Sequence, residues 1–514
     1  MQYRLISIAI ALSLGLSQAA SSDLPTTPQV PEPTLAQFKT ATPESVGLDS
    51  AQLTKMLNYL QTPGFDMESI IIARHGKVVL EAYVAPFHAD IPHQVNSVTK
   101  SFMATLIGML INDGRLKLTD TVADILPQYA DLPNAKLITV EQLLGMKSGL
   151  LWQEWRSDNF GDFGELKRQP DIDIVKFVLN RSLEPDQVNN FNYNSGGSDL
   201  LGVLGEAALG SSLADYAEQR LFKPLGISNT RWINSDQQGH LGGGRGLYIM
   251  PLDMLKLGEL YRQNGVWQGA QILPASWVQY ATAPMLSITS GSHYYGAQWW
   301  VGQNREWYSA QGYGGQIIAV FPQDDITMVM TSRNNGNNFS FGFSALREYY
   351  LKLKDQRAEN PIAHTALQEK ITQLATPTPT SKLRSPLEKI IHNRKIDINN
   401  PSHYLSQLQF EFNQDVVAIR MSPRKWSESP FKVQARLGAA WHSEPRPHVD
   451  DPLQKSSTES MRATRAQWLD KQTLQVESID LDETWGFSFK IKFKGNKATL
   501  LNMNDSIASQ GNIR

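Results

Sequence analysis

Apolar positions follow both helical and strand-like periods in the first part of the chain, up to about residue 356. Two strand-like runs at residues 69–73 and 78–83 flank a turn and predict a β-hairpin. Residues 101–112 are apolar almost all round and stop at an Asp-Gly pair, which predicts a helix buried in a large domain. A further helix is expected at residues 50–60.

Strand-like patterns return near the end of this part of the chain. Three runs at residues 307–310, 317–321 and 326–331 are separated by turn signals, and residues 343–353 predict a closing helix. Strands at both ends with helices between them predict an α+β fold.

The remaining chain alternates apolar and polar residues with the period of half-buried strands. A Pro- and Thr-rich segment at residues 376–381 precedes this region and is typical of a semi-rigid linker. Six runs predict a small antiparallel β domain, at residues 405–412, 416–421, 432–437, 474–479, 486–493 and 498–503.

The length of the chain also predicts two folded units. It has 514 residues, whereas single cores stop growing near ~250–300 residues. The expected division is a signal peptide over residues 1–20, an extended linker over 21–43, a main domain over 44–356, a helix and Pro/Thr linker over 357–385, and a C-terminal β domain over 386–514.

The first twenty residues have the pattern of a secretory signal. Arg4 gives the positive region, residues 5–16 give the apolar region, and residues 17–19 form a small-x-small cleavage site. The apolar run is too short to span a bilayer comfortably. We therefore expect an exported protein, periplasmic or secreted, with no membrane span after cleavage.

Composition narrows the classes of function. Hydrophobic residues make up 41% and charged residues 19%, as in ordinary soluble proteins, and the net charge of −2 gives no electrostatic case for nucleic-acid binding. Cysteine is absent, so disulfides, thiolate metal sites and a lipid-modified cysteine are excluded.

The first candidate chemistry is the tetrapeptide from Ser97 to Lys100, at the start of the predicted buried helix. Positions i and i+3 share a helix face, so the amine can reach the hydroxyl oxygen. A serine needs a base to become a nucleophile, and burial can lower the pKa of a lysine enough for that role. The same pattern recurs at residues 422–425 and 429–432, in a strand-rich context that does not suit it.

Two Gly-rich segments complete the candidate site. Residues 191–198 form a polar loop that carries Tyr193 and Ser195 and runs into a helical pattern. An unperturbed tyrosine has a pKa of ~10, so a phenolate at neutral pH would need an ammonium such as that of Lys100 beside it. Residues 310–316 form a turn between strands, where glycines permit close approach of a ligand and an edge amide can face an oxyanion.

In this order the three segments resemble the serine β-lactamase and penicillin-binding superfamily, whose motifs are S-x-x-K, Y-x-N or Y-x-S, and K-T-G or H-x-G. The resemblance extends to residues 138–150, which end in Ser-Gly-Leu, and to residues 243–253. It covers roughly residues 45–350. The finer match is to esterases and 6-aminohexanoate-dimer hydrolases.

The resemblance implies a fold and a reaction. The fold would be a three-layer antiparallel sheet with helices on both faces and a helical insertion. Ser97 would attack an ester or amide carbonyl, Lys100 and Tyr193 would relay the proton to the leaving group, and water would release the acyl-enzyme. The substrate would be a small or peptide-like ester or amide, and no metal or organic cofactor is implied.

The family also assigns supporting roles to other positions. Ser195 would stand where the second motif usually has its Asn. The backbone amides of Ser97 and Tyr313 would bind the oxyanion. The other expected site residues are Gly312, Gly315 and Gln316 on the substrate strand, and Trp152 and Trp155 in a substrate pocket.

The chain departs from the family pattern at one position, and two alternative functions stay open. Ala310 replaces the Lys or His that ordinarily helps to hold a β-lactam or peptide carboxylate. A class C-like β-lactamase or D-alanyl carboxypeptidase is the alternative enzyme, and an inactive relative that binds a ligand or partner protein is the other alternative. An α/β-hydrolase and a zinc hydrolase are disfavoured, because G-x-S-x-G and H-E-x-x-H are missing.

Overall fold

The computed structural model describes residues 38–513, except for 63–64, 155–160, 169–171, 289–292, 335–340, 354–357, 401–404, 424–429, 439, 447–459, 485 and 504. The signal peptide expected over residues 1–20, most of the linker expected over 21–43, and Trp155 therefore lie outside the described residues. Lys39–Thr40, expected in that linker, form an edge strand instead.

The larger unit is built on a nine-stranded sheet, antiparallel except for its first pair. In spatial order its strands are β1 (Lys39–Thr40), β3 (Lys77–Tyr83), β2 (Met67–Arg74), β14 (Ile326–Ser332), β13 (Gln316–Phe321), β12 (Tyr308–Gly312), β11 (Trp300–Gly302), β10 (His293–Tyr295) and β9 (Leu286–Ile288). The sequence predicted β2, β3, β12, β13 and β14 within two residues at each end. Buried apolar runs explain why these strands could be recognised: β13 and β14 are buried at every position.

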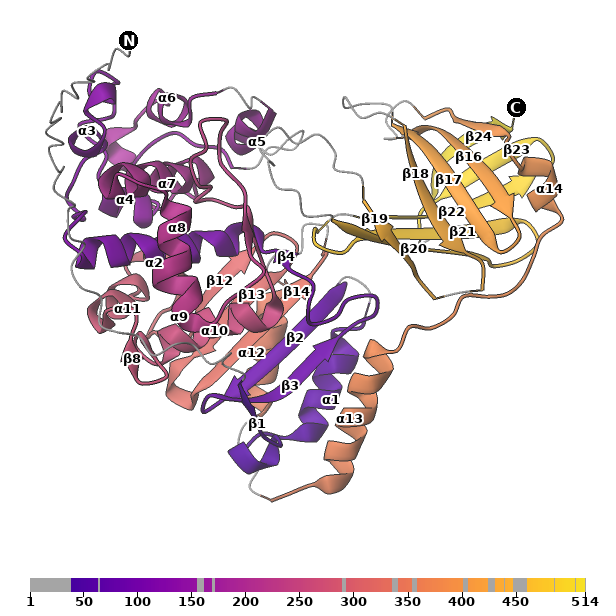
Figure 1. Ribbon diagram of the computed structural model, residues 1–514, viewed down its shortest axis with the longest axis horizontal. Helices are drawn as coiled ribbons and strands as arrows, with labels where there is room; N and C mark the ends of the chain where they lie inside the picture. The colour runs from indigo at the N-terminus through magenta and orange to yellow at the C-terminus, as the bar shows by residue number, and fades with distance from the viewer. Residues whose placement is uncertain are drawn as a thin grey trace, which may run out of the picture.

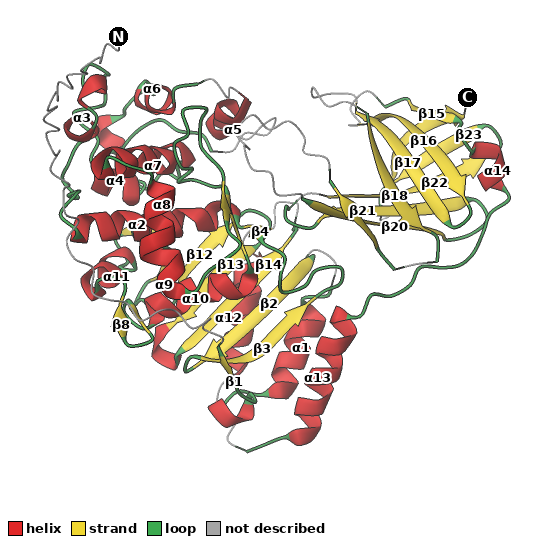
Figure 2. Ribbon diagram, in the orientation of Figure 1, coloured by secondary structure: helices red, strands yellow, loops and turns green. Residues whose placement is uncertain are grey.

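Helices cover both faces of this sheet, so the unit has three layers (Figures 1 and 2). Helices α1 (Ser50–Tyr59), α12 (Phe341–Leu353) and α13 (Pro361–Ala375) share one apolar core with the sheet. On the other face, α2 (Thr99–Asn112) and α10 (Pro251–Arg262) join a second core with the helical insertion. The predicted α+β fold is confirmed.

The helical insertion lies between β3 and β9 in the chain. Its remaining helices are α3 (Val122–Ile125), α4 (Val140–Leu144), α5 (Gly161–Arg168), α6 (Ile174–Leu179), α7 (Ser195–Leu209), α8 (Leu213–Ala217), α9 (Lys223–Leu225) and α11 (Ala275–Ala281). Small sheets join them, made of β4 (His93–Gln94), β6 (Leu247–Ile249) and β5 (Arg231–Trp232), and of β7 (Val266–Trp267) and β8 (Ala270–Gln271). In the described part of the chain, no helix is both long and apolar enough to cross a membrane.

The C-terminal unit is a ten-stranded antiparallel sheet whose inward side chains form a core of their own. After α14 (Leu387–Ile391), its strands are β15 (Lys395–Ile398), β16 (Leu405–Asn413), β17 (Val416–Pro423), β18 (Phe431–Arg436), β19 (His442–Pro445), β20 (Met461–Trp468), β21 (Thr473–Asp480), β22 (Gly486–Lys494), β23 (Lys497–Leu501) and β24 (Ile507–Ile513). The sequence predicted six of these strands and missed β15, β19, β20 and β24.

The two units meet beside the segment that leads to Ser97. Phe87 and Ile91 pack against Ala463, Ile479 and Leu481 of the C-terminal sheet. Figure 1 shows β19, β20 and β21 reaching toward β4 and β14. The contact is thus made by the end of the C-terminal sheet that lies nearest the candidate site.

That contact also contains charged groups on the loop after β21. Arg231 is 3.0 Å from the carboxylate of Asp482, and both side chains are largely buried. Tyr248 donates a hydrogen bond to Glu483, and the backbone N–H of Gln94 donates to the carbonyl of Asp482 at 2.8 Å. The C-terminal unit therefore supports β4 and β6, which stand next to the segment of Ser97.

Candidate active site

The serine of the first motif lies in a tight turn between a strand and a helix. Strand β4 ends at Gln94, and the 3-10 turn Asn96–Val98 continues directly into α2. Asn96 adopts a left-handed backbone conformation with φ of 48°, which Asn tolerates better than most residues. Its side-chain amide donates to the carbonyl of Tyr313 at 2.9 Å. The turn that presents Ser97 is thereby tied to the β12–β13 turn.

Lys100 extends into the protein beneath Ser97, with only 1% of its surface exposed. Its Nζ lies 3.0 Å from Ser97 Oγ, 2.9 Å from Ser195 Oγ and 2.7 Å from the carbonyl oxygen of Gly244. Lys100 is therefore not a solvated surface lysine. Three segments far apart in the sequence therefore converge on one amine.

The surroundings of Lys100 favour a neutral amine more than solvent does. Burial lowers its pKa to about 8, and the charge of Arg245 acts in the same direction. The carboxylates of Glu154 and Asp199 oppose this and raise the pKa. At a pKa of about 8, roughly a tenth of the amine is neutral at pH 7.

Tyr193 stands over the same amine, with the centre of its ring 4.9 Å from Lys100 Nζ. Burial raises its pKa, the charge of Glu154 adds to the rise, and a hydrogen bond with Ser97 works against it. Tyr193 is therefore a neutral phenol at neutral pH. The phenolate considered from the sequence is disfavoured because burial and the charge of Glu154 outweigh the hydrogen bond with Ser97.

A group of aromatic rings surrounds Tyr193. Trp300 stacks on it at 6.0 Å between ring centres, and Tyr295 meets both rings edge-on. Phe191 contacts Tyr295 at 5.1 Å and Trp300 at 6.0 Å. Phe191, Tyr193 and Trp300 are partly exposed, so this aromatic cluster offers an apolar surface next to the serine hydroxyl.

Ser195 is the first residue of α7, whose N-terminus is capped by Asn194. Its hydroxyl accepts from Lys100 and donates to Glu154 through a short hydrogen bond. The backbone at Gly244 packs closely there, because a Cβ at that position would lie 2.8 Å from the carbonyl oxygen of Ser195. This glycine allows its carbonyl to reach Lys100.

Glu154 was not foreseen from the sequence. It is 7% exposed, and it accepts from the backbone N–H of Ser195 at 3.0 Å and from the indole N–H of Trp152 at 2.7 Å, besides the Ser195 hydroxyl. The only sequence signal was a carboxylate two residues after a tryptophan in the segment that follows Ser-Gly-Leu. Spacing alone could not show that it meets α7.

The β12–β13 turn packs against the segment of residues 95–97 that leads into α2, called the nucleophile segment below. A Cβ at Gly312 would lie 2.2 Å from the carbonyl oxygen of Val95 and 3.2 Å from the backbone nitrogen of Ser97. Tyr313 follows directly. The structure thus brings the two segments expected to bind an oxyanion into contact.

The other residues expected on this strand and in the pocket have different surroundings. Gly315 is left-handed and faces Ser332, and Gln316 is buried, with its amide donating to the carbonyl of Ser332 at 2.5 Å. Trp152 is buried against Gly196 and holds Glu154. These three shape the turn and the floor of the site, and contact with substrate stays a prediction for them.

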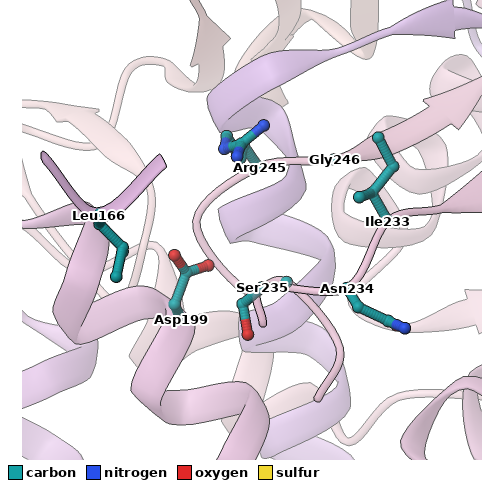
Figure 3. Close-up of a pocket in the computed structure, with 8 residues that line it drawn as sticks. Leu166, Asp199, Ile233, Asn234, Ser235, Arg245 and Gly246 are labelled. Carbon is teal, nitrogen blue, oxygen red and sulfur yellow. The ribbon is translucent and has the colours of Figure 1, made fainter. Parts of the chain in front are cut away.

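A small pocket lies between α7 and the segment around Gly244 (Figure 3). Asp199 accepts from the backbone N–H of Gly244 at 2.7 Å, and burial raises the pKa of its carboxyl. Arg245 lies across the same pocket. Within the described ranges, His, Asp and Glu residues form no group of three that could hold a metal ion.

The chain is similar to known proteins over the larger unit. The family model described as Beta-lactamase matches residues 62–348. A 6-aminohexanoate-dimer hydrolase of Paenarthrobacter ureafaciens is 25% identical over 299 residues, which are 52% of this chain and 72% of that protein. Penicillin-binding protein 4 of Amycolatopsis lactamdurans is 34% identical over 145 residues, which are 27% of this chain and 35% of that protein.

The fold is shared with solved structures. A candidate 6-aminohexanoate-dimer hydrolase from Bacillus anthracis superposes with a TM-score of 0.53 at 20% identity, covering 65% of this chain and 88% of that one. The match supports the three-layer arrangement of sheet and helices described above.

Proposed function

The chain belongs to the Beta-lactamase family, and on that premise we propose that it is a serine hydrolase that cleaves ester or amide bonds through an acyl-enzyme on Ser97. The observation that carries this proposal is the buried amine of Lys100, 3.0 Å from Ser97 Oγ. A base at hydrogen-bond distance from a hydroxyl is what a serine nucleophile requires.

In the first step, neutral Lys100 takes the proton of Ser97 while Ser97 Oγ bonds to the carbonyl carbon. The carbonyl electrons move to oxygen, and the resulting oxyanion rests on the backbone N–H groups of Ser97 and Tyr313. The contact of Gly312 with the nucleophile segment supports this placement. Removing one such donor from an oxyanion site costs about 10²–10³ in kcat in enzymes of this type.

In the second step, the bond to the leaving group breaks and the leaving group needs a proton. Tyr193 is a neutral phenol held against Ser97, so it can donate that proton and recover one from protonated Lys100. Water then attacks the acyl-enzyme while neutral Lys100 takes a proton from it, and Lys100 returns that proton to Ser97 Oγ as the acyl bond breaks.

The surroundings favour a neutral substrate with an apolar group beside the scissile bond. The aromatic cluster of Phe191, Tyr193, Tyr295 and Trp300 adjoins the serine. Ala310, where relatives carry a cation, is buried in the core with α2. An apolar ester or amide suits these groups better than a β-lactam or peptide carboxylate does.

The proposal is tested by the mass of the intact protein after brief exposure to a fluorophosphonate, together with turnover of p-nitrophenyl esters. Wild type should gain one adduct and hydrolyse the esters, and Ser97→Ala should do neither. A folded wild type that gains no adduct would contradict the proposal and favour the inactive binding relative. Acylation by a penicillin, or release of D-alanine from D-Ala-D-Ala peptides, would favour the alternative enzyme.

Export of the protein is proposed separately. It rests on residues 1–20, whose pattern is that of a signal peptide. Cell fractionation followed by N-terminal sequencing of the mature chain tests it, with cleavage expected after residue 19 or 20.

A further inference from the structure

Glu154 meets donors at each of its three hydrogen bonds. Glu154 accepts from the backbone N–H of Ser195 and from the indole N–H of Trp152. Both groups can only donate. The third partner is the hydroxyl of Ser195. An ionised carboxylate is an acceptor only, so each of the three donors finds an acceptor oxygen on Glu154. The single proton of the Ser195 hydroxyl is then committed to Glu154.

This commitment fixes the direction of the hydrogen bonds around Lys100. As an ammonium, Lys100 has three N–H groups and three neighbouring oxygens, on Ser97, Ser195 and Gly244. When the ammonium loses a proton, its lone pair must face a group that can donate. The carbonyl of Gly244 cannot donate, Ser195 has already given its proton to Glu154, and the Tyr193 hydroxyl is hydrogen-bonded to Ser97. The lone pair is therefore left to face Ser97.

We infer that Glu154 is a positioning residue that acts through Ser195 and directs the lone pair of neutral Lys100 toward the hydroxyl of Ser97. The inference rests on the proposed function, in which Lys100 is the base. Without Glu154, Ser195 and Gly244 would not fix the direction of the Lys100 lone pair, because the Ser195 hydroxyl could rotate and either donate to Lys100 or accept from it. Glu154 removes that freedom.

Replacing Glu154 with Gln should reverse the direction of the hydrogen bond to the Ser195 hydroxyl, while the side chain keeps its size and shape. The Gln carbonyl would still accept from the backbone of Ser195 and from Trp152, so its NH₂ group would face the Ser195 hydroxyl. Ser195 would then accept from Gln and turn its own proton toward Lys100. The lone pair of Lys100 would be occupied by Ser195 and lost to Ser97.

The same substitution should also move the titration of Lys100. The charges that face this amine are Glu154 and Asp199, which raise its pKa, and Arg245, which lowers it, and neutral Tyr193 lies above it. Loss of the Glu154 charge lowers the pKa of Lys100 further. Glu154→Asp keeps the charge, so it separates this electrostatic shift from a loss of hydrogen-bond direction.

The experiment is the pH dependence of kcat/KM for a neutral p-nitrophenyl ester in Glu154→Gln, Ser195→Ala and the double variant. We expect Glu154→Gln to lower the plateau about 10- to 100-fold, less than the ~10²–10⁴-fold that a general base itself contributes, and to move the acid limb to lower pH. The double variant should lose no more than the worse single variant, because Glu154 acts through Ser195. Glu348→Gln, a carboxylate exposed on α12, is the matched control and should leave the profile unchanged.

Two results would overturn the inference. One is an unchanged plateau and acid limb in Glu154→Gln, and the other is losses that multiply in the double variant. If Glu154→Gln does not fold, Glu154→Asp keeps the charge and shortens the reach. It should lower the plateau without moving the acid limb to lower pH, and an unchanged plateau there would equally contradict the inference. Full activity in Lys100→Ala would instead contradict the proposed function itself.

Discussion

At the scale of single residues, the proposed mechanism makes catalysis depend on the protonation of one buried amine, that of Lys100. The rate should follow the neutral fraction of Lys100, so kcat/KM should rise with pH and level off above a pH of about 8, where this pKa lies. A pH–rate profile with a neutral ester checks this. A profile that is flat from pH 6 to 9 would contradict it.

Lys100→Arg provides a control for charge. Its guanidinium stays protonated at every accessible pH, so the variant keeps a cation but cannot act as a base. We expect activity to fall at least 10³-fold with no recovery at high pH. Recovery at pH 9 to 10 would show that another group takes the proton.

Gly312 is a residue whose lack of a side chain is required by packing. A methyl group there would lie 2.2 Å from the Val95 carbonyl oxygen, so Gly312→Ala must separate β12 from the nucleophile segment. We expect kcat to fall about 10²-fold, as for a lost oxyanion donor. Gly145→Ala is the control, because the added carbon would mainly meet a flexible lysine side chain; equal effects in the two variants would contradict the prediction.

At the scale of elements, the turn before α2 is held by one side chain. Asn96 combines a left-handed backbone with a hydrogen bond to the carbonyl of Tyr313. Asn96→Gly should keep the backbone conformation without strain and lose the bond, whereas Asn96→Ala should lose the bond and hold the same left-handed conformation under strain. We therefore expect similar losses of kcat in both variants, and a further loss of about 1 kcal/mol of unfolding free energy in Asn96→Ala.

Kinetics and urea unfolding of the two Asn96 variants check this separation. Full kcat in Asn96→Gly would show that the tie to Tyr313 has no part in catalysis. A more stable Asn96→Ala than Asn96→Gly would show that the left-handed turn carries no strain.

Elements with a simple period were the ones that the sequence located well. The predicted hairpin and the buried helix agree with β2, β3 and α2, because their apolar runs are long and bounded by turn residues. Short elements such as β4 and β5 have two residues each and carry no period to read. Strand β20 was missed although its burial alternates in part, since Arg462, Thr464 and Arg465 interrupt the apolar pattern.

At the scale of the whole molecule, the C-terminal unit is joined to the catalytic unit by a largely buried ion pair. Arg231 and Asp482 are 3.0 Å apart, and Ser460 also donates to Asp482. Removing one partner of a buried pair leaves the other uncompensated, at a cost on the order of 3 kcal/mol. We expect Asp482→Asn to lower the free energy of unfolding by about this amount.

The measurement is urea unfolding of Asp482→Asn, Arg231→Met and the double variant. The double variant should be more stable than the sum of the single losses predicts, because both act on one pair. Strict additivity would show that the pair does not couple the units. Glu411→Gln, whose partner Lys432 is half exposed, is the control and should change stability by less than about 1 kcal/mol.

The C-terminal unit also contacts the turn between β12 and β13. A Cβ at Gly314 would lie 2.8 Å from the methyl group of Thr484, so the loop after β21 packs directly on the turn that contains Tyr313. Helix α13 lies in the segment where a helix and a linker were expected, and it contributes Leu367 and Leu374 to the core of the larger unit. The boundary expected at residue 356 therefore falls between two helices of one core.

The sequence by itself determined the α+β class, the positions of the main strands along the chain, and Ser97, Lys100 and Tyr193 as candidates. Periodicity and short motifs are local properties of the chain, so they can be read without the fold. Only the tertiary structure decided that Lys100 is buried, that Glu154 stands behind Ser195, and that Gly244 supplies a carbonyl to the amine. These contacts join residues 41 to 144 positions apart. The folded chain brings such groups together through packing of whole helices and strands, and no local pattern records that packing.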